Sequence, residues 1–190
     1  RQLIQKFLLG AVTFSQGTAD YLSTDFRAAN LQEGTKPYSA GEHNWDEAYG
    51  YFGGARDYTT SSDDEIASKG GRADRSSGYF DSNGDGLVDL TSEINFGNST
   101  NCAKRDRGTA SNSNPTDFTT DVFNAFYYGR LALNVGAIRE NIGNTELVVI
   151  ESMAAQAAIT WEKCIAATVV HYINDITGDI GNFSEGQFAD

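Results

Sequence analysis

Residues 115–176 decide the fold, and they read PTDFTTDVFNAFYYGRLALNVGAIRENIGNTELVVIESMAAQAAITWEKCIAATVVHYINDI. Apolar residues recur every three or four positions on both sides of a short turn at Gly143-Asn-Thr145, which is the spacing of amphipathic helices. We therefore predict one helix from residue 117 to about 141 and a second from about 146 to 176. Two long helices joined by a short turn pack as antiparallel neighbours.

The apolar faces of these two helices define the expected core. The face of the first helix comprises Phe118, Val122, Phe126, Leu133 and Ile138. The face of the second helix comprises Ile150, Met153, Ala157, Trp161, Cys164, Thr168 and His171. Small residues at Gly129 and Gly136 on the first helix permit close packing.

The rest of the chain is also predicted to be helical where it is regular. Helical spacing runs from Leu3 to about Phe26, and an aromatic helix is expected at residues 45–52. No segment alternates like a strand. The predicted fold class is mainly α: a helical bundle with a long ordered loop insertion at residues 55–116. We expect a single helical domain over residues 1–190 that is part of a longer chain, because Arg1 already lies in a helical pattern.

Composition narrows the class of protein. The formal net charge is −12 and the sequence pI is about 4.5. A basic footprint is missing, so nucleic acid is not an expected partner. No apolar run reaches the length of a membrane span. The acidity favours cation binding.

The chain has two cysteines, Cys102 in a segment predicted to be a polar loop and Cys164 in the last helix. In an oxidising compartment they are the only possible intrachain disulfide. The alternative is a pair of unrelated free thiols. We favour the disulfide, because the loop described next also points to an extracytoplasmic location.

The segment DSNGDGLVD at residues 81–89 has the oxygen spacing of a calcium loop. The predicted calcium ligands are Asp81, Asn83, Asp85, the Leu87 carbonyl, Asp89 and Glu93. An EF-hand loop ends with a bidentate Glu at position 12, where this sequence has Ser92, and Glu93 follows one residue later. The alternative is an acidic Asx-turn that holds no metal. A calcium loop of this kind suits a structural role where free calcium is abundant.

A second group of candidate ligands is GEHNWDEAYGY at residues 41–51. On a helix, His43, Asp46 and Glu47 share one face, and an imidazole beside carboxylates is half of a site for iron or zinc. The alternative is that His43 caps a helix or bonds to a neighbouring carboxylate. The other histidine, His171, has Asp175 four residues on, and we interpret it as a buried neutral core residue.

The motif Gly41-x-His43-x-x-Asp46 resembles the G-x-H-x-x-E signature of imelysin-like proteins of bacteria, with Asp in place of Glu. The wider segment is similar to an uncharacterised bacterial lipoprotein family that carries a His-Trp-Asp-Glu-Ala segment and an Asp-rich loop leading into Ser-Glu-Ile-Asn-Phe, here residues 92–96. The resemblance covers about residues 36–107. It implies an exported helical bundle, one half of an imelysin-like fold, often in an iron-uptake setting.

These observations lead to two main functional hypotheses. The first is an extracytoplasmic metal-binding protein of imelysin-like type in iron or other metal acquisition, located in the periplasm, on the cell surface or secreted, with a structural calcium site. The second is a surface or adhesive structural module, braced by calcium and a disulfide, with a cell-surface or self-association partner. A hydrolase using His43 as general base is a weaker third option.

Overall fold

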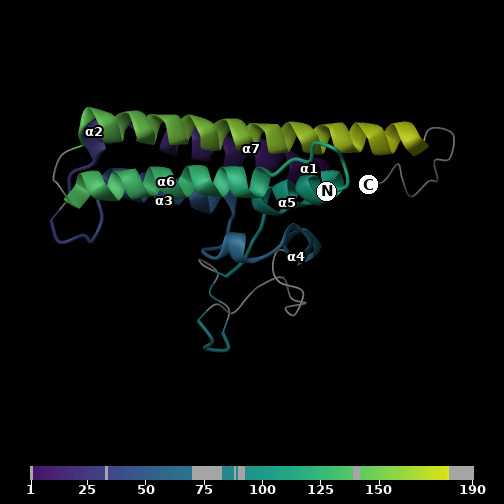
Figure 1. Cartoon of the computed structure of the whole chain (residues 1–190), viewed down its shortest axis with the longest axis horizontal. Coiled ribbons are helices and arrows are strands. Elements are labelled where there is room, and N and C mark those ends of the chain that lie inside the picture. The colour runs from purple at the N-terminus through teal and green to yellow at the C-terminus, as the bar shows by residue number, and fades with distance from the viewer. Residues whose placement is uncertain are drawn as a thin grey trace.

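The protein is a helical bundle built around two long helices, α6 and α7 (Figure 1). The computed structural model describes residues 2–32, 34–69, 83–87, 89, 93–138 and 142–179. Within these ranges the regular elements are helices and no strand forms. The predicted fold class, a mainly α bundle, is therefore confirmed.

Helices α6 (Phe118–Ile138) and α7 (Asn144–Asp179) lie side by side and antiparallel, as predicted (Figure 1). Their facing side chains form the centre of the core, with Leu133 on α6 and Trp161 on α7 fully buried. Helix α7, with 36 residues, is longer than α6, with 21, so the C-terminal part of α7 projects beyond α6. The prediction that His171 belongs to the buried core is wrong for this reason, since its side chain is 43% exposed.

The N-terminal segment is helical, as predicted, but most of it is not α-helix. After α1 (Gln2–Leu8), the chain forms two π-helices at Leu9–Phe14 and Gln16–Tyr21. Gly17 lies where a Cβ would come within 2.7 Å of the Trp161 ring, so a glycine is required for this close approach to α7. A short helix α2 (Phe26–Ala29) follows.

Helix α3 (Ala40–Phe52) joins this segment to the central pair. Its Trp45 is 1% exposed and donates a hydrogen bond from Nε1 to the Phe126 carbonyl on α6 at 2.8 Å. The ring lies against Gly129, where a Cβ would be 2.1 Å from a Trp45 ring carbon. Phe52 is fully buried and meets Trp161 edge to face. Trp45 and Phe52 are thus core residues, as the sequence indicated, and Tyr49 and Tyr51 pack half-buried against the core.

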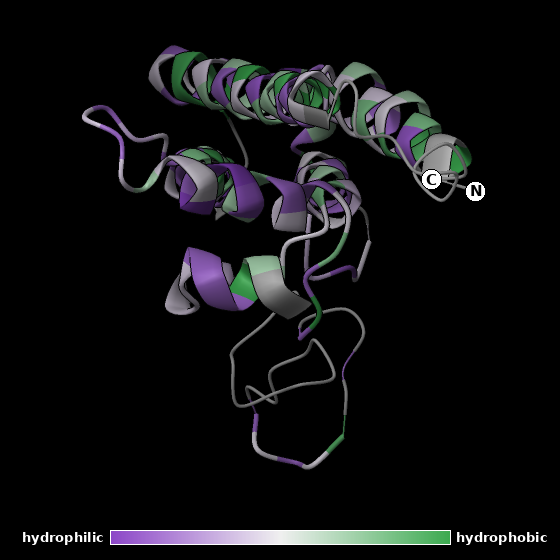
Figure 2. Ribbon diagram, turned by 90° about the vertical axis from the view of Figure 1, so that its right-hand side faces the viewer, coloured by the Kyte–Doolittle hydropathy of each residue, from purple (hydrophilic) through white to green (hydrophobic). Residues whose placement is uncertain are grey.

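The prediction of a loop over residues 55–116 is wrong in part. The region contains a 3₁₀ turn (Tyr58–Thr60), α4 (Asp63–Lys69) and the 12-residue helix α5 (Asn98–Thr109). Figure 2 looks along the bundle and shows α4 below the layer that holds α3, α5 and α6. What remains of the predicted insertion is the stretch between α4 and α5, of which residues 83–87, 89 and 93–97 are described.

Cys102 and Cys164 form a disulfide, as predicted. Cys102 lies on α5 rather than in a loop, Cys164 lies on α7, and both side chains are fully buried. Their Cα atoms are 5.2 Å apart and the bond closes a sequence separation of 62 residues. Such a cross-link stabilises the fold mainly by restricting the unfolded chain.

Green and purple residues mix along the outer faces of the helices in Figure 2. In the described part of the chain, no helix combines the length and the apolar character needed to cross a membrane.

Candidate functional site

The candidate ligands His43, Asp46 and Glu47 all lie on α3, and the sequence before that helix determines where it begins. Ser39 Oγ accepts a hydrogen bond from the Glu42 N–H, and the Glu42 carboxylate accepts one from the Ser39 N–H at 2.8 Å. This reciprocal capping box satisfies two free donors at the start of the helix. It places His43 on the first turn, one residue after Glu42.

A single arginine of α6, Arg130, binds two carboxylates of α3. Its Nη1 is 2.6 Å from Glu42 Oε1, and its Nε is 2.8 Å from Asp46 Oδ1. The Glu42 side chain is 4% exposed, whereas Asp46 is 56% exposed. Asn134, one turn further along α6, also donates to Glu42 Oε1 at 3.1 Å. The arrangement is a clamp between α3 and α6 that is buried at Glu42 and open to solvent at Asp46.

The protonation of the clamp follows from its hydrogen bonds. Burial alone raises the pKa of Glu42, but the hydrogen bonds from Ser39 and Asn134 and the positive charge of Arg130 outweigh it, and the pKa is lowered. Burial alone lowers the pKa of Arg130, yet Asp46 and Glu42 raise it. Both groups are therefore held in their charged forms at neutral pH.

His43 lies at the surface beside this clamp. Its ring stacks on Tyr38 with centroids 5.3 Å apart, and its Nε2 is 3.8 Å from Glu47 Oε1. The two side chains are 52% and 42% exposed. The structure therefore brings His43 and Glu47 together, as the helical spacing predicted, while Asp46 bonds to Arg130. Sequence reasoning missed Arg130, because no local pattern signals a partner 84 residues away from Asp46.

Among the described residues, no group of three or more His, Cys, Asp or Glu side chains has the geometry to hold a metal ion. The iron or zinc site at His43, Asp46 and Glu47 stays a prediction that would need ligands from elsewhere. His171 repeats the same pairing on α7, with Nε2 3.2 Å from Asp175 Oδ2.

The predicted calcium loop is described at Asn83, Asp85, Leu87, Asp89 and Glu93, while Asp81 lies outside the described residues. Asn83 Oδ1 accepts a hydrogen bond from the Asp85 N–H at 3.0 Å, and Asp85 Oδ1 accepts one from the Leu87 N–H at 2.8 Å. Gly84 and Gly86 have φ of 74° and 77°, a left-handed backbone that glycine adopts without strain. These contacts suit both a metal-free Asx-turn and a cation loop.

Glu93 lies at the opening of this loop, where the sequence predicted a closing ligand. Glu93 is buried, with 1% of the residue exposed to solvent. Oε2 accepts a hydrogen bond from the Asp89 N–H at 2.9 Å, and Oε1 accepts one from the Asn83 N–H at 3.4 Å. The carboxylate thus bridges both ends of the loop, and its oxygens have the hard, anionic chemistry that Ca²⁺ prefers.

The chain after Glu93 is tied to the core. Asn95 Oδ1 accepts a hydrogen bond from the Ala55 N–H at 2.7 Å, and the Phe96 N–H donates to the Gly53 carbonyl at 2.9 Å. Ser99 Oγ also donates to the Gly53 carbonyl, at 2.7 Å. The exit of the loop is therefore held against the C-terminal end of α3.

Comparison with known proteins finds a family match over the N-terminal third of the chain. Residues 1–69 match the model of a family described as Domain of unknown function (DUF4856). The match includes α3 with His43, and the loop around Asn83 lies outside it. No curated protein and no solved structure matches the chain. The chain is thus similar, over residues 1–69, to a family whose function is itself undescribed.

Proposed function

We propose that the protein is an extracytoplasmic structural or binding module that presents the loop at residues 83–87 at its surface and braces this loop with a calcium ion. The observation that supports this most is the position of Glu93. A carboxylate that is 1% exposed lies across a loop whose other side chains include Asn83, Asp85 and Asp89. The Glu93 carboxylate accepts hydrogen bonds from the N–H groups of Asn83 and Asp89, and its anionic oxygens are the kind of ligand that a calcium ion bound in the same loop would use.

The disulfide supports the proposed location. Cysteine pairs form and persist in oxidising compartments and are rare in the cytosol of most organisms. Free calcium is also abundant outside the cell, where loops with incomplete ligand sets still bind it. Residues 83–87 are all exposed, as a segment displayed to a partner requires.

Thermal unfolding with and without calcium tests the proposal. Calcium at about ten times its Kd is expected to stabilise the folded state by about 1.4 kcal/mol, because it binds the folded loop and not the unfolded chain. Glu93→Gln keeps the size and one acceptor oxygen, so it is expected to abolish the calcium response. Glu162→Gln removes an equal charge from an exposed position on α7 and should leave the response intact.

A melting temperature that is the same in calcium, magnesium and chelator would contradict the proposal. In that case the loop is the metal-free Asx-turn. Equal loss of the calcium response in Glu93→Gln and Glu162→Gln would also count against it, because the response would then come from general screening of the acidic surface.

A second candidate function is transition-metal binding of imelysin-like type at His43 and Glu47. The contact that favours it is the 3.8 Å approach of His43 Nε2 to Glu47 Oε1. Equilibrium dialysis against zinc or ferrous iron with His43→Ala tests it. The chain supplies a matched control, because His171 and Asp175 form the same i, i+4 pair. Metal lost in His43→Ala and kept in His171→Ala supports this function, whereas metal absent from the unaltered protein rules it out.

A further inference from the structure

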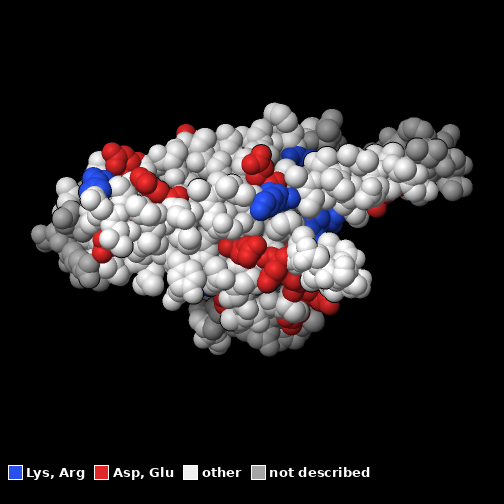
Figure 3. All heavy atoms as spheres, turned by 45° about the horizontal axis from the view of Figure 1, so that its top comes forward, with Lys and Arg blue, Asp and Glu red and all other residues white. Residues whose placement is uncertain are grey.

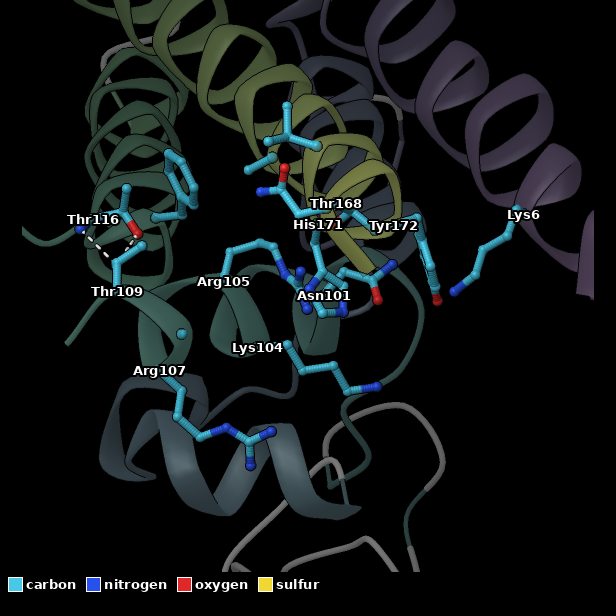
Figure 4. A pocket seen from close by; sticks show the side chains of 15 residues that line it. Lys6, Asn101, Lys104, Arg105, Arg107, Thr109, Thr116, Thr168, His171 and Tyr172 are labelled. Atoms are coloured by element: carbon cyan, nitrogen blue, oxygen red, sulfur yellow. Dashed lines mark hydrogen bonds between the residues drawn. The ribbon is translucent and has the colours of Figure 1, made fainter. Parts of the chain in front are cut away.

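A cavity of about 750 Å³ lies at the base of the projecting C-terminal part of α7 (Figure 4). Its walls come from α5 and α7, with Lys6 of α1 at one side and the start of α6 at the other. Basic side chains line it: Lys6, Lys104, Arg105, Arg107 and His171. The chain has only 14 Lys and Arg residues and two His, against a net charge of −12, so this is a marked concentration of positive charge.

Within the described residues, the two central cations of this cavity form no ion pair, although the charge of Asp175 acts on Arg105. In the described part of the chain, Lys104 and Arg105 have no carboxylate within ion-pair distance, and the structure gives neither side chain a hydrogen-bond partner. The Nε of Arg105 is buried without an acceptor. Two other cations do have partners: Arg107 Nε is 3.9 Å from Asp64 Oδ1, and His171 Nε2 is 3.2 Å from Asp175 Oδ2.

This arrangement carries an electrostatic cost. Burial lowers the pKa of Lys104, and the charges of Lys6, Arg105 and Arg107 lower it further. Burial and Arg107 also lower the pKa of Arg105, although Tyr172 and Asp175 oppose this. Groups that are partly desolvated beside like charges gain stability when an anion joins them.

The helix dipole does not account for this cluster. The C-terminal end of α5 favours positive charge only in its last turn, which holds Arg107 but leaves Lys104 and Arg105 further back. Figure 3 shows Lys and Arg side chains close together where the projecting part of α7 leaves the bundle, beside a group of acidic side chains.

The lining is suited to an organic anion rather than to a bare ion. Figure 4 shows Arg105 and His171 pointing into the cavity from α5 and α7. Asn101 adds amide donors on the same side, while Phe118 and Val170 supply an apolar wall. Charged donors that converge beside an apolar wall are the usual chemistry of a small-molecule site.

We propose that this cavity binds a small organic oxyanion, with its phosphate, sulfate or carboxylate group at Lys104, Arg105 and His171 and its apolar part against Phe118. The guanidinium of Arg105 offers a planar fork of donors that matches such groups. The site uses neither the loop around Glu93 nor the His43 surface, so it stands independently of the proposed function.

Calorimetric titration of the full chain with inorganic phosphate, citrate and phenyl phosphate tests the site. We expect saturable binding, with phenyl phosphate tighter than inorganic phosphate because of the apolar wall. Lys104→Gln and Arg105→Gln should each weaken binding about tenfold, the effect of losing one hydrogen bond to a charged group. Lys163→Gln removes a charge from an exposed position on α7 that does not line the cavity, and it should leave binding unchanged.

A second measurement needs no altered protein. The chain has two histidines, His43 and His171, so proton NMR has only two sets of ring signals to assign, and the spectrum of His43→Ala assigns them. Phosphate added at constant pH should move the His171 signals and leave those of His43 in place. This readout keeps the test valid even where a substitution disturbs folding.

Two results would overturn the site. One is the absence of saturable binding for all three probes at low ionic strength. The other is equal weakening by Lys163→Gln and Lys104→Gln together with equal movement of both histidine signals, which would reduce the effect to nonspecific attraction.

Discussion

Glu42 on α3 and Arg130 on α6 form the tightest charged contact between these helices, with Oε1 and Nη1 2.6 Å apart. The glutamate is 4% exposed and also caps its own helix through Ser39. One carboxylate therefore begins α3 and attaches it to α6.

Removing the arginine should destabilise the fold substantially. Arg130→Gln leaves Glu42 buried without its charged partner, and we expect a loss of about 2–3 kcal/mol in the free energy of unfolding. Asp46→Asn should cost less than about 1 kcal/mol, because Asp46 is 56% exposed and solvent screens its pair. Urea denaturation of both variants measures the difference, and equal costs would contradict a clamp that is buried at Glu42 and exposed at Asp46.

Because the pKa of Glu42 is lowered in the folded state, the stability of the protein is expected to fall at acidic pH. A carboxyl group whose folded pKa lies below its ordinary value of 4.5 contributes stability that is fully present above that value. The contribution is lost as pH falls through the folded pKa. The difference in unfolding free energy between the unaltered protein and Glu42→Gln should thus shrink in strong acid, and denaturation at a series of pH values checks it. If the difference in unfolding free energy stayed constant from neutral pH to strong acid, Glu42 would not have a lowered pKa in the folded state.

Breaking the disulfide should weaken the bundle. Replacing Cys102 and Cys164 together by Ala is expected to cost about 4 kcal/mol, because the bond closes a long loop in the unfolded chain and the two side chains are fully buried. Thermal melting of the double variant measures this. A reducing agent should lower the melting temperature of the unaltered protein and leave that of the double variant unchanged.

Replacing glycine by alanine is expected to have opposite effects on stability at two positions. Gly129→Ala places a methyl group 2.1 Å from the Trp45 ring and should cost about 3 kcal/mol or more through overpacking. Gly50→Ala on α3 meets no atom within 4 Å and should stabilise the helix by about 0.5–1 kcal/mol. Equilibrium unfolding of both variants provides the measurement. If Gly129→Ala proved neutral, the close approach of α3 and α6 would be in error.

Sequence periodicity predicted the α6 and α7 pair because both helices carry apolar residues at every third or fourth position. It missed α5, in which Cys102 and Ala103 are the buried apolar residues among polar ones, so tertiary packing and the disulfide outweigh a weak local preference. It also missed the π-helical turns near Gly17, since the pattern of apolar positions does not separate them from α-helix.

The candidate sites also differ in whether the sequence alone could predict them. Helical spacing brought His43 beside Glu47, and loop spacing placed Glu93 at the loop around Asn83, because both relationships are local. Arg130 and the cavity of α5 and α7 depend on contacts between distant segments. A local signal for the cavity did exist: Lys104-Arg105-Asp106-Arg107 is a basic cluster in a strongly acidic chain.

The bond between Cys102 and Cys164 has a mechanical consequence for the segment around Glu93, which our proposal assigns to the display of a surface loop. Glu93 precedes Cys102 by nine residues. A force that pulls on the segment around Glu93 would therefore be carried through the disulfide to α7, the longest helix. On the C-terminal side of the segment, unfolding of α5 alone would not detach the chain from the bundle, because the disulfide joins α5 to α7. A reductant that cleaves the disulfide would remove this restraint on α5.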